Sequence, residues 1–258
     1  MMKEDEDLLP GAQAAELSLD LLSSPDALYD RTKKIMWSAV RYKEMRMMYA
    51  CALKEIRTKF DVLNTEFNVK YSRNPISSIS TRLKSTESTA RKLLARNLPL
   101  SLESVEKNIY DIAGIRVVCS YIDDIYMIAD ALLKQDDIRL IARKDYIRNP
   151  KPNGYRSLHL IVSIPVFFAE QKKDVNVEVQ IRTIAMDFWA SLEHQIKYKR
   201  SIPGQQEVVD RLRGCADVIA RTDEEMLALR QKIEKAEDLP SEEEELFEKL
   251  RKLDIQIV

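Results

Sequence analysis

The sequence holds few of the residues that build several common ligand sites. Only 5 glycines occur among 258 residues, and neither the GxGxxG pattern of Rossmann folds nor the GxxxxGK pattern of P-loops is present, so a glycine-rich phosphate loop is excluded. The chain has 2 histidines, which argues against a histidine-rich metal centre. The 3 cysteines, Cys51, Cys119 and Cys215, lie far apart in apolar surroundings, so we expect reduced thiols and neither a disulfide frame nor a zinc site.

Long apolar runs and an excess of one charge are missing as well. The longest apolar run, residues 160–169, is broken by Ser163 and Pro165 and is too short to span a bilayer. The first residues are acidic, whereas a secretory signal begins with basic residues. Lysine plus arginine numbers 41 and aspartate plus glutamate 42, a net charge of −1, which differs from the strongly basic composition of nucleic-acid-coating proteins. We therefore expect a cytoplasmic protein whose partner is neither a membrane nor nucleic acid.

Apolar periodicity divides the chain into three parts. Residues 1–24 show no strong pattern, and we expect a flexible tail there. A helix is predicted from Pro25 to Asn74, with one apolar stripe at alternating intervals of four and three: Tyr49, Leu53, Ile56, Phe60, Leu63 and Phe67. The same alternation predicts a second long helix with a coiled-coil-like seam: Cys215, Ile219, Thr222, Met226, Leu229 and Ile233. Residues 25–235 are thus expected to form the main domain, and the acidic residues 236–258 a C-terminal helix.

The middle of the chain changes to the pattern of a sheet. Runs rich in β-branched residues predict strands at 115–121, 138–147, 155–164 and 175–181, with helices near 125–132 and at 183–199. The prediction is an α/β (α+β) fold in which helices flank a central mixed sheet of about five strands. Before the first of these strands, residues 76–98 carry five basic residues against one acidic residue, which is also typical of a solvated helix face.

Two predicted strands carry polar residues on one face. In the strand from Val175, alternation places four polar residues opposite the apolar ones: Asn176, Glu178, Gln180 and Arg182. This pattern is typical either of an edge strand with a wet face or of the floor of a polar groove. In the strand from Tyr155, the residues Tyr155, Ser157 and His159 share a face on which a planar base and a ribose or phosphate could bind. The alternative is a half-buried tyrosine beside a core histidine.

Acidic and basic residues suggest what such a groove would bind. Asp111 lies just before the strand at 115–121, and together with Glu178 it could hold a magnesium ion, although a carboxylate there is also a common cap. Residues 139–156 carry six basic residues against one acidic residue. Two cationic stretches, two carboxylates and a stacking aromatic in a neutral chain point to nucleotide polyphosphate chemistry.

Three long motifs resemble the synthetase domain of the RelA/SpoT homologues. They are YDIAGIR at Tyr110–Arg116, KPNGYRSLH at Lys151–His159 and EVQIRTIAMDFWASLEH at Glu178–His194. Arg82 to Lys84, followed by Ser88 and Lys92, is similar to the ATP-binding segment of that domain. The resemblance covers about residues 45–235 and implies a nucleotidyltransferase-like fold. The second and third motifs are closer in wording to the RelP type of small alarmone synthetase than to the RelQ type.

The resemblance implies an activity and a set of site residues. The family transfers pyrophosphate from ATP to the ribose 3′-hydroxyl of GDP or GTP, giving ppGpp or pppGpp and AMP. Asp111 and Glu178 would hold Mg²⁺, and Glu178 would also orient or deprotonate the attacking hydroxyl. ATP would be bound by Arg82 and Arg116, which sandwich the adenine, and through its phosphates by Lys84, Ser88 and Lys92. GDP or GTP would be bound by Tyr155, which stacks on guanine, and by Lys144, Lys151, His159, Gln180 and Asp187.

The family pattern also implies an assembly and leaves other functions open. A homotetramer is expected through the apolar seams at 49–67 and 215–233, and packing of these seams within the chain is the alternative. No histidine–aspartate hydrolase motif is present, so the chain is expected to synthesise the alarmone and not degrade it. A pyrophosphokinase of the same fold that acts on the 3′ end of tRNA or on adenosine nucleotides remains an alternative. A catalytically inactive scaffold is a further one, against which the presence of both Asp111 and Glu178 argues.

Overall fold

The computed structural model describes residues 25–71, 73–198 and 205–236, together with Leu246 and Lys249. In chain order the elements are α2 (Pro25–Tyr71), β1 (Ile76–Leu83), α3 (Thr86–Leu94), α4 (Leu102–Asn108), β2 (Ala113–Cys119), α5 (Ile122–Leu133), β3 (Arg139–Asp145), β4 (Leu158–Phe167), β5 (Lys172–Thr183), α6 (Ile184–Tyr198) and α7 (Gln205–Ala236). The expected tail at 1–24 and nearly all of the expected C-terminal helix at 236–258 lie outside the described residues, so both stay predictions.

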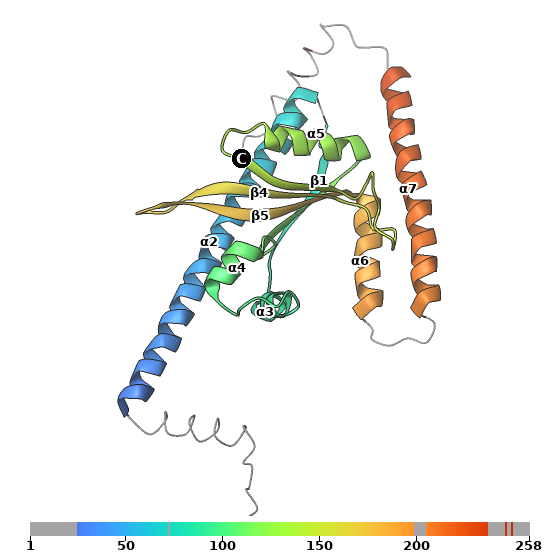
Figure 1. The fold of residues 1–258 in the computed structure, drawn as a ribbon. Coiled ribbons are helices and arrows are strands. Elements are labelled where there is room, and N and C mark those ends of the chain that lie inside the picture. Colours follow the sequence, from blue (N-terminus) through green and yellow to red (C-terminus); the bar gives the residue numbers. More distant parts are fainter. Residues whose placement is uncertain (1–24, 72, 199–204, 237–245, 247–248, 250–258) are drawn as a thin grey trace, which may run out of the picture.

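Five strands form one mixed sheet in the order β1-β2-β5-β4-β3 (Figure 1). Within it β2 and β5 run parallel, and the other neighbouring pairs run antiparallel. The strands predicted at 115–121, 138–147, 155–164 and 175–181 correspond to β2, β3, β4 and β5, so the predicted α+β fold is confirmed. Since β5 lies in the middle of the sheet, the polar residues that alternate along it do not belong to an edge strand.

The fifth strand, β1, lies in the basic stretch at residues 76–98, for which a solvated helix face was one interpretation. That alternative is wrong for the start of the basic stretch, because Ile76–Leu83 is an edge strand paired antiparallel with β2. The helix α3 begins only at Thr86, where the Ser85 side chain caps it by accepting the backbone N–H of Ser88 at 3.2 Å. Residues 76–83 form a strand because they pair with β2, and not because their own sequence has a strand pattern.

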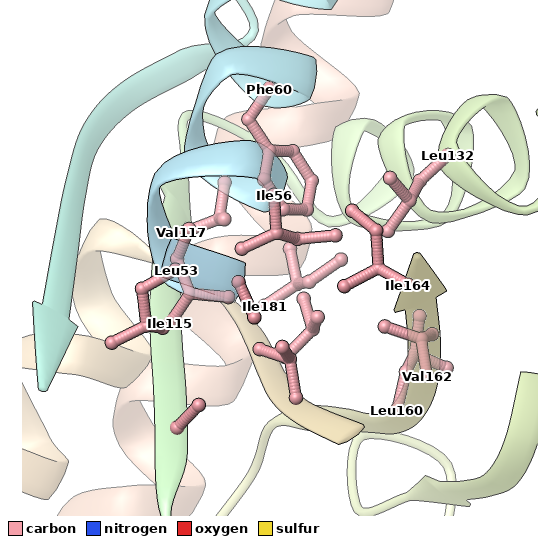
Figure 2. Close-up of a cluster of buried hydrophobic side chains, with 14 of the residues drawn as sticks. Leu53, Ile56, Phe60, Ile115, Val117, Leu132, Leu160, Val162, Ile164 and Ile181 are labelled. Atoms are coloured by element: carbon pink, nitrogen blue, oxygen red, sulfur yellow. The ribbon is translucent and has the colours of Figure 1, made fainter. Parts of the chain in front are cut away.

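One face of the sheet is the apolar core. The helices α2 and α5 cover this face, and Figure 2 shows Ile56 and Phe60 of α2 beside Leu132 of α5. Beneath them lie side chains of the three central strands: Ile115, Val117, Leu160, Val162, Ile164 and Ile181. Each large apolar side chain buried in this way stabilises the fold by about 1.5–3 kcal/mol.

The apolar stripe at 49–67 of α2 belongs to this core. Its members Tyr49, Leu53, Ile56, Phe60 and Leu63 are at most 6% exposed. The expectation that this seam joins chains in a tetramer is therefore wrong, because these side chains already pack against the sheet of their own chain. The exposed apolar side chains of α2 do not belong to this stripe and include Tyr29, Met36 and Trp37 near the start of the helix and Val62, Val69 and Tyr71 near its end.

The helices α6 and α7 lie side by side (Figure 1). The indole Nε1 of Trp189 on α6 donates to the carbonyl oxygen of Leu212 on α7 at 2.9 Å, and Ala216 packs beside it. The predicted seam of α7 is divided: Ile219 packs against this same cluster, whereas Met226, Leu229 and Ile233 are 46–59% exposed. Packing within the chain therefore accounts for Ile219 but not for the exposed end of the seam. Among the described helices, none has the apolar length needed to cross a membrane.

Candidate active site

The polar face of the sheet aligns the candidate residues in rows. Each of the five strands contributes one member of the first row, in spatial order Ser80, Arg116, Gln180, His159 and Lys144. A neighbouring row holds Arg82, Gly114 and Glu178. Partners in register share a face of the sheet. Strand order and register thus bring residues that are far apart in sequence onto one surface.

A cavity of about 280 Å³ opens over this face above β1, β2 and β5. It is lined by Ser80, Arg82, Lys84, Asp111, Gly114, Ile115, Arg116, Glu178 and Gln180. Gly114 leaves its floor flat, and a methyl group added there would have the Arg82 carbonyl oxygen, at 3.6 Å, as its nearest neighbour. A ligand can therefore approach the backbone closely at this point. Both predicted metal ligands, Asp111 and Glu178, line the same cavity.

Asp111 is held between two lysines. Its Oδ2 lies 3.0 Å from the Lys84 ammonium and 2.8 Å from the Lys92 ammonium. Burial pushes the pKa of Asp111 up, but the hydrogen bonds from Lys92 and Lys84 outweigh it and hold the pKa below the ordinary value. The other carboxylate oxygen, Oδ1, is buried and has no hydrogen-bond partner. A buried acceptor without a partner is uncommon, and a bound cation would satisfy it.

The donor set around this oxygen suits magnesium. Mg²⁺ takes oxygen ligands and is usually held by one or two carboxylates, with water and substrate phosphates completing its shell. Asp111 with its unpartnered Oδ1, and Glu178 in the same cavity, supply those two carboxylates. Among the described residues, no three His, Cys, Asp or Glu side chains gather into a group that could hold a metal by themselves. The pair therefore fits an ion shared with a nucleotide.

The other residues of the predicted ATP site are distributed around the cavity. Arg82 and Arg116 line it, and the Arg116 guanidinium also lies 3.3 Å from Asp187 Oδ1. Lys92 reaches the cavity through its contact with Asp111. Ser88 lies in the first turn of α3, where its hydroxyl accepts a hydrogen bond from the Ser85 hydroxyl at 2.8 Å, and it is not part of the cavity lining.

An aromatic and cationic cluster lies on the other side of Glu178. The Tyr155 hydroxyl is 2.8 Å from His159 Nε2, which confirms that these two residues share a surface. The Lys151 ammonium lies 4.8 Å from the centre of the Tyr155 ring and 4.6 Å from that of Tyr146. Lys144 is exposed on β3, opposite His159. The Lys151 ammonium therefore lies over the ring that was predicted to stack on a base.

Two residues beside Tyr155 make contacts that the sequence does not indicate. Ser157 lies just before β4, and its side chain is hydrogen-bonded to Tyr155, as expected for residues on one face. It is fully buried and donates to the Ile181 carbonyl oxygen at 3.2 Å, so it supports Tyr155 and does not meet a ligand itself. Arg156 does not add to the cationic surface around Tyr155. Its guanidinium donates to the Ala216 carbonyl oxygen and to Asp217 on α7, each at 3.2 Å.

Glu178 receives hydrogen bonds on both carboxylate oxygens. Gln180 Nε2 donates to Oε2 at 3.0 Å, and His159 Nδ1 lies 3.4 Å from Oε1. Burial raises the pKa of Glu178, but the contacts from His159 and Gln180 outweigh it and hold the pKa below its usual range. The carboxylate is therefore ionised at neutral pH, as a metal ligand or a hydrogen-bond acceptor for a hydroxyl must be.

Sequence reasoning assigned no role to two residues of this site. Arg182 is the last polar residue of β5, and its guanidinium donates to Tyr155, Gln180 and Asp187 at 2.7–3.0 Å. Its place in line with Glu178 and Gln180 was the available signal. Tyr146 packs edge-on against Tyr155 and His159, and no pattern in the sequence indicates that contact.

Comparison with known proteins identifies the family. Residues 81–203 match the model of a region found in RelA/SpoT proteins. GTP pyrophosphokinase YwaC of Bacillus subtilis is 41% identical over 193 residues, which cover 75% of this chain and 92% of that protein. GTP pyrophosphokinase YjbM of the same organism is 33% identical over 198 residues, which cover 76% of this chain and 92% of that protein.

Solved structures of small alarmone synthetases have the same fold as this chain. Small alarmone synthetase 2 from Bacillus subtilis superposes with a TM-score of 0.67 at 42% identity, covering 74% of this chain and 98% of that one. Small alarmone synthetase 1 from the same organism, bound to its product pppGpp, superposes with a TM-score of 0.68 at 34% identity, covering 75% and 98%. Identity of this size over nearly the whole of each relative, with the same fold, shows that the chain belongs to the RelA/SpoT family and, within it, to the small alarmone synthetases.

Proposed function

We propose that this protein is a GTP/GDP diphosphokinase, a (p)ppGpp synthetase. It transfers pyrophosphate from ATP to the ribose 3′-hydroxyl of GDP or GTP and releases AMP. The observation that carries the proposal is the position of Glu178, between a cavity lined by cations and a cluster of Tyr155, Lys151 and His159. The names of the relatives, GTP pyrophosphokinases and small alarmone synthetases, support the same reaction.

The donor nucleotide is assigned to the cavity above β1 and β2. Arg82 and Arg116 have the planar, always-charged groups that suit stacking on adenine. Lys84 and Lys92, which hold Asp111 in this structure, are assigned to the ATP phosphates, with Ser88 at the start of α3 beside them. Asp111 and Glu178 would hold Mg²⁺, which when bound neutralises charge on the pyrophosphate.

The acceptor is assigned to the cluster around Tyr155. The tyrosine ring stacks on guanine, and Lys144, Lys151 and His159 bind the phosphates and ribose of GDP or GTP. Gln180 and Asp187 complete this side of the site through their contacts with Glu178 and with Arg116. The two nucleotides then meet above Glu178, and most of the rate enhancement comes from holding them in line.

The chemical step needs one proton acceptor. The 3′-oxygen of the acceptor attacks the β-phosphorus of ATP, a new O–P bond forms, and the bond from that phosphorus to the oxygen bridging the α- and β-phosphates breaks. AMP leaves with the bonding electron pair. The proton of the hydroxyl passes to the ionised Glu178 carboxylate and from there to solvent.

A product assay tests the reaction. Purified protein is mixed with ATP, Mg²⁺ and one of GDP, GTP, GMP, ADP or uncharged tRNA, and the products are resolved by anion exchange. We expect AMP together with ppGpp or pppGpp. AMP that appears only with tRNA or only with ADP would replace the guanine acceptor by the alternative one. If no AMP forms with any of these acceptors, the proposal is overturned. Release of pyrophosphate from ppGpp would contradict the expected lack of hydrolase activity.

Assembly and location complete the proposal. A homotetramer is supported by the exposed seam of α7 and by the exposed apolar stripe of α6, Ile184, Phe188, Leu192 and Ile196. The cytoplasm is supported by the substrates, since ATP and guanine nucleotides are made and used there. Light scattering tests the assembly: Leu229→Lys on the seam should reduce the molar mass, whereas Lys232→Glu beside it should not. A wild-type monomer at micromolar concentration would contradict the tetramer.

A further inference from the structure

Five side chains of the site form a closed ring of polar contacts. The Tyr155 hydroxyl meets His159 Nε2 at 2.8 Å, and His159 Nδ1 lies 3.4 Å from Glu178 Oε1. The other oxygen of Glu178 accepts from Gln180 Nε2 at 3.0 Å. Gln180 Oε1 accepts from Arg182 Nη2 at 2.7 Å, and the same nitrogen donates to the Tyr155 hydroxyl at 3.0 Å, which closes the ring.

Arg182 determines the direction of the two hydrogen bonds that it makes in this ring. A guanidinium has five N–H groups and no acceptor, so it can only donate. The Tyr155 oxygen therefore accepts from Arg182. At the other end of the ring the ionised Glu178 carboxylate can only accept, so the histidine proton that faces it is on Nδ1. Gln180 must turn its oxygen to Arg182, which directs its NH₂ group at the other oxygen of Glu178.

The position of Arg182 is itself well defined by its surroundings. Its side chain is 4% exposed, and the charge is balanced by Asp187, whose Oδ1 accepts from Arg182 Nη1 at 3.0 Å. The same oxygen of Asp187 lies 3.3 Å from Arg116. A buried guanidinium that donates to three acceptors cannot move without breaking several contacts at once, and a lysine cannot reproduce its planar geometry.

We propose that Arg182 is a positioning residue for the acceptor half of the reaction, because it bonds Tyr155 directly and Glu178 through Gln180 and so holds them in one hydrogen-bonded unit. This inference rests on the proposed function and adds to it. Tyr155 is assigned to the guanine base and Glu178 to the attacking hydroxyl, so one buried side chain fixes the distance between base recognition and the reacting oxygen. Glu178 and Gln180 also line the ATP cavity, but the residues assigned to the adenine and the ATP phosphates, Arg82, Arg116, Lys84 and Lys92, lie outside the ring, so a change of Arg182 is expected to affect GDP more than ATP.

Steady-state kinetics of Arg182→Lys test the proposal. The lysine keeps the charge opposite Asp187 but loses the planar set of donors. We expect kcat/KM for GDP to fall about 100-fold, the loss typical of a reacting group displaced by about 1 Å. The KM for ATP should stay within about 2-fold of the wild-type value, because the residues assigned to the adenine and the phosphates of ATP do not belong to the ring. Arg57→Lys, an exposed arginine of α2 that pairs with Asp61, is the matched control and should change neither value.

A second variant keeps the test decisive if Arg182→Lys does not fold. Tyr155→Phe removes only the hydroxyl and leaves the ring that stacks on the base, so it should lower kcat for GDP with a smaller change in KM. Where Arg182→Lys does fold, the combined loss in the double variant should be clearly smaller than the product of the two single losses, because both changes break the same contact. Losses that multiply would overturn the proposal.

The remaining outcomes separate this inference from the proposed function. A wild-type protein that makes no AMP from ATP and GDP would overturn the reaction itself. An active wild type with unchanged GDP kinetics in Arg182→Lys, or with unchanged kinetics in Tyr155→Phe, would overturn only the role of Arg182. An Arg182→Lys protein that loses ATP and GDP binding equally, together with a lower melting temperature, would show a structural role and would also overturn it.

Discussion

The two faces of strand β5 are built from alternate residues and do different work. Val177, Val179 and Ile181 are 0% exposed beneath α2 and α5, whereas Glu178, Gln180 and Arg182 point to the other face and contact one another. The polar face is not simply a wet surface, because Arg182 is nearly as buried as the valines. A register shift of one residue would exchange the two sets, so the packing that stabilises the fold also places the groups that do the chemistry.

The largest effect on activity is expected from Glu178→Gln on the polar face. The amide is of similar size but cannot accept a proton or serve as a charged metal ligand, so the rate of AMP formation should fall on the order of 10³-fold. The melting temperature should change by no more than about 3 °C, because no apolar contact is lost. Initial rates by anion exchange and a thermal melt measure both. Glu106→Gln, an exposed glutamate that pairs with Lys173, is the control. A variant with a near wild-type rate would contradict the role given to Glu178.

The opposite result is expected from Phe60→Ala on the apolar face. Phe60 is fully buried between α2 and the sheet (Figure 2), so its truncation leaves a cavity and should cost about 3–5 kcal/mol of unfolding free energy. Urea denaturation measures this loss. The kcat per folded molecule should remain at the wild-type value, because the site lies on the other side of the sheet. A fall in kcat without a loss of stability would show that the two faces are coupled more strongly than their separation suggests.

Residues within one strand or one motif were the easiest to predict from the sequence. Alternation along β5 separated Val177 and Val179 from Glu178 and Gln180, and the period of α2 identified Ile56 and Phe60 as core residues. These patterns are local, because burial on one face repeats every two residues in a strand and every three to four in a helix. The motifs around Asp111 and Tyr155 were equally local.

Features that depend on pairing between distant segments could not be predicted in this way. The strand β1 has no strong strand pattern and forms because β2 offers it an edge. The sequence places Arg156 in a cationic stretch, but its guanidinium donates to Ala216 of α7, which lies 60 residues further along the chain. The role of the stripe at 49–67 depended on which surface it meets, and periodicity gives the face of a helix but not its partner.

Two neighbouring residues of β2 allow a finer comparison of the faces. Ile115→Val removes one methylene from the apolar core and should cost about 0.5–1.5 kcal/mol of stability, with no change in kinetics.

Gly114→Ala adds one methyl to the cavity floor, where the nearest atom is 3.6 Å away, so stability should change by less than about 1 kcal/mol. The added methyl takes space from the ligand, and the KM for ATP should rise. Urea denaturation and kinetics on both variants give the answer, and the reverse pattern would contradict the assignment of ATP to this cavity.

The smallest effect is expected where a polar pair continues the buried row of β5. Thr183 is fully buried at the end of that row, and its hydroxyl donates to Asp223 of α7 at 2.5 Å. Burial raises the pKa of Asp223 above its value in the unfolded chain. Folding therefore favours the protonated acid, and the stability from this group is fully present below the unfolded pKa, about 3.9, and is lost as the pH rises through the folded value.

Asp223→Asn removes this titration and can still accept the threonine hydroxyl. The variant should thus gain stability relative to the wild type as the pH rises from about 4 to 7, by no more than about 1 kcal/mol at neutral pH. Thermal melts of both proteins across that range measure the difference, and Asp210→Asn, an exposed aspartate on the same helix with only a local contact to Gln206, is the control. If Asp223→Asn instead loses stability relative to the wild type as the pH rises, the ionised carboxylate stabilises the fold. The apolar face of β5 would then accommodate a buried charge, as the polar face does with Arg182.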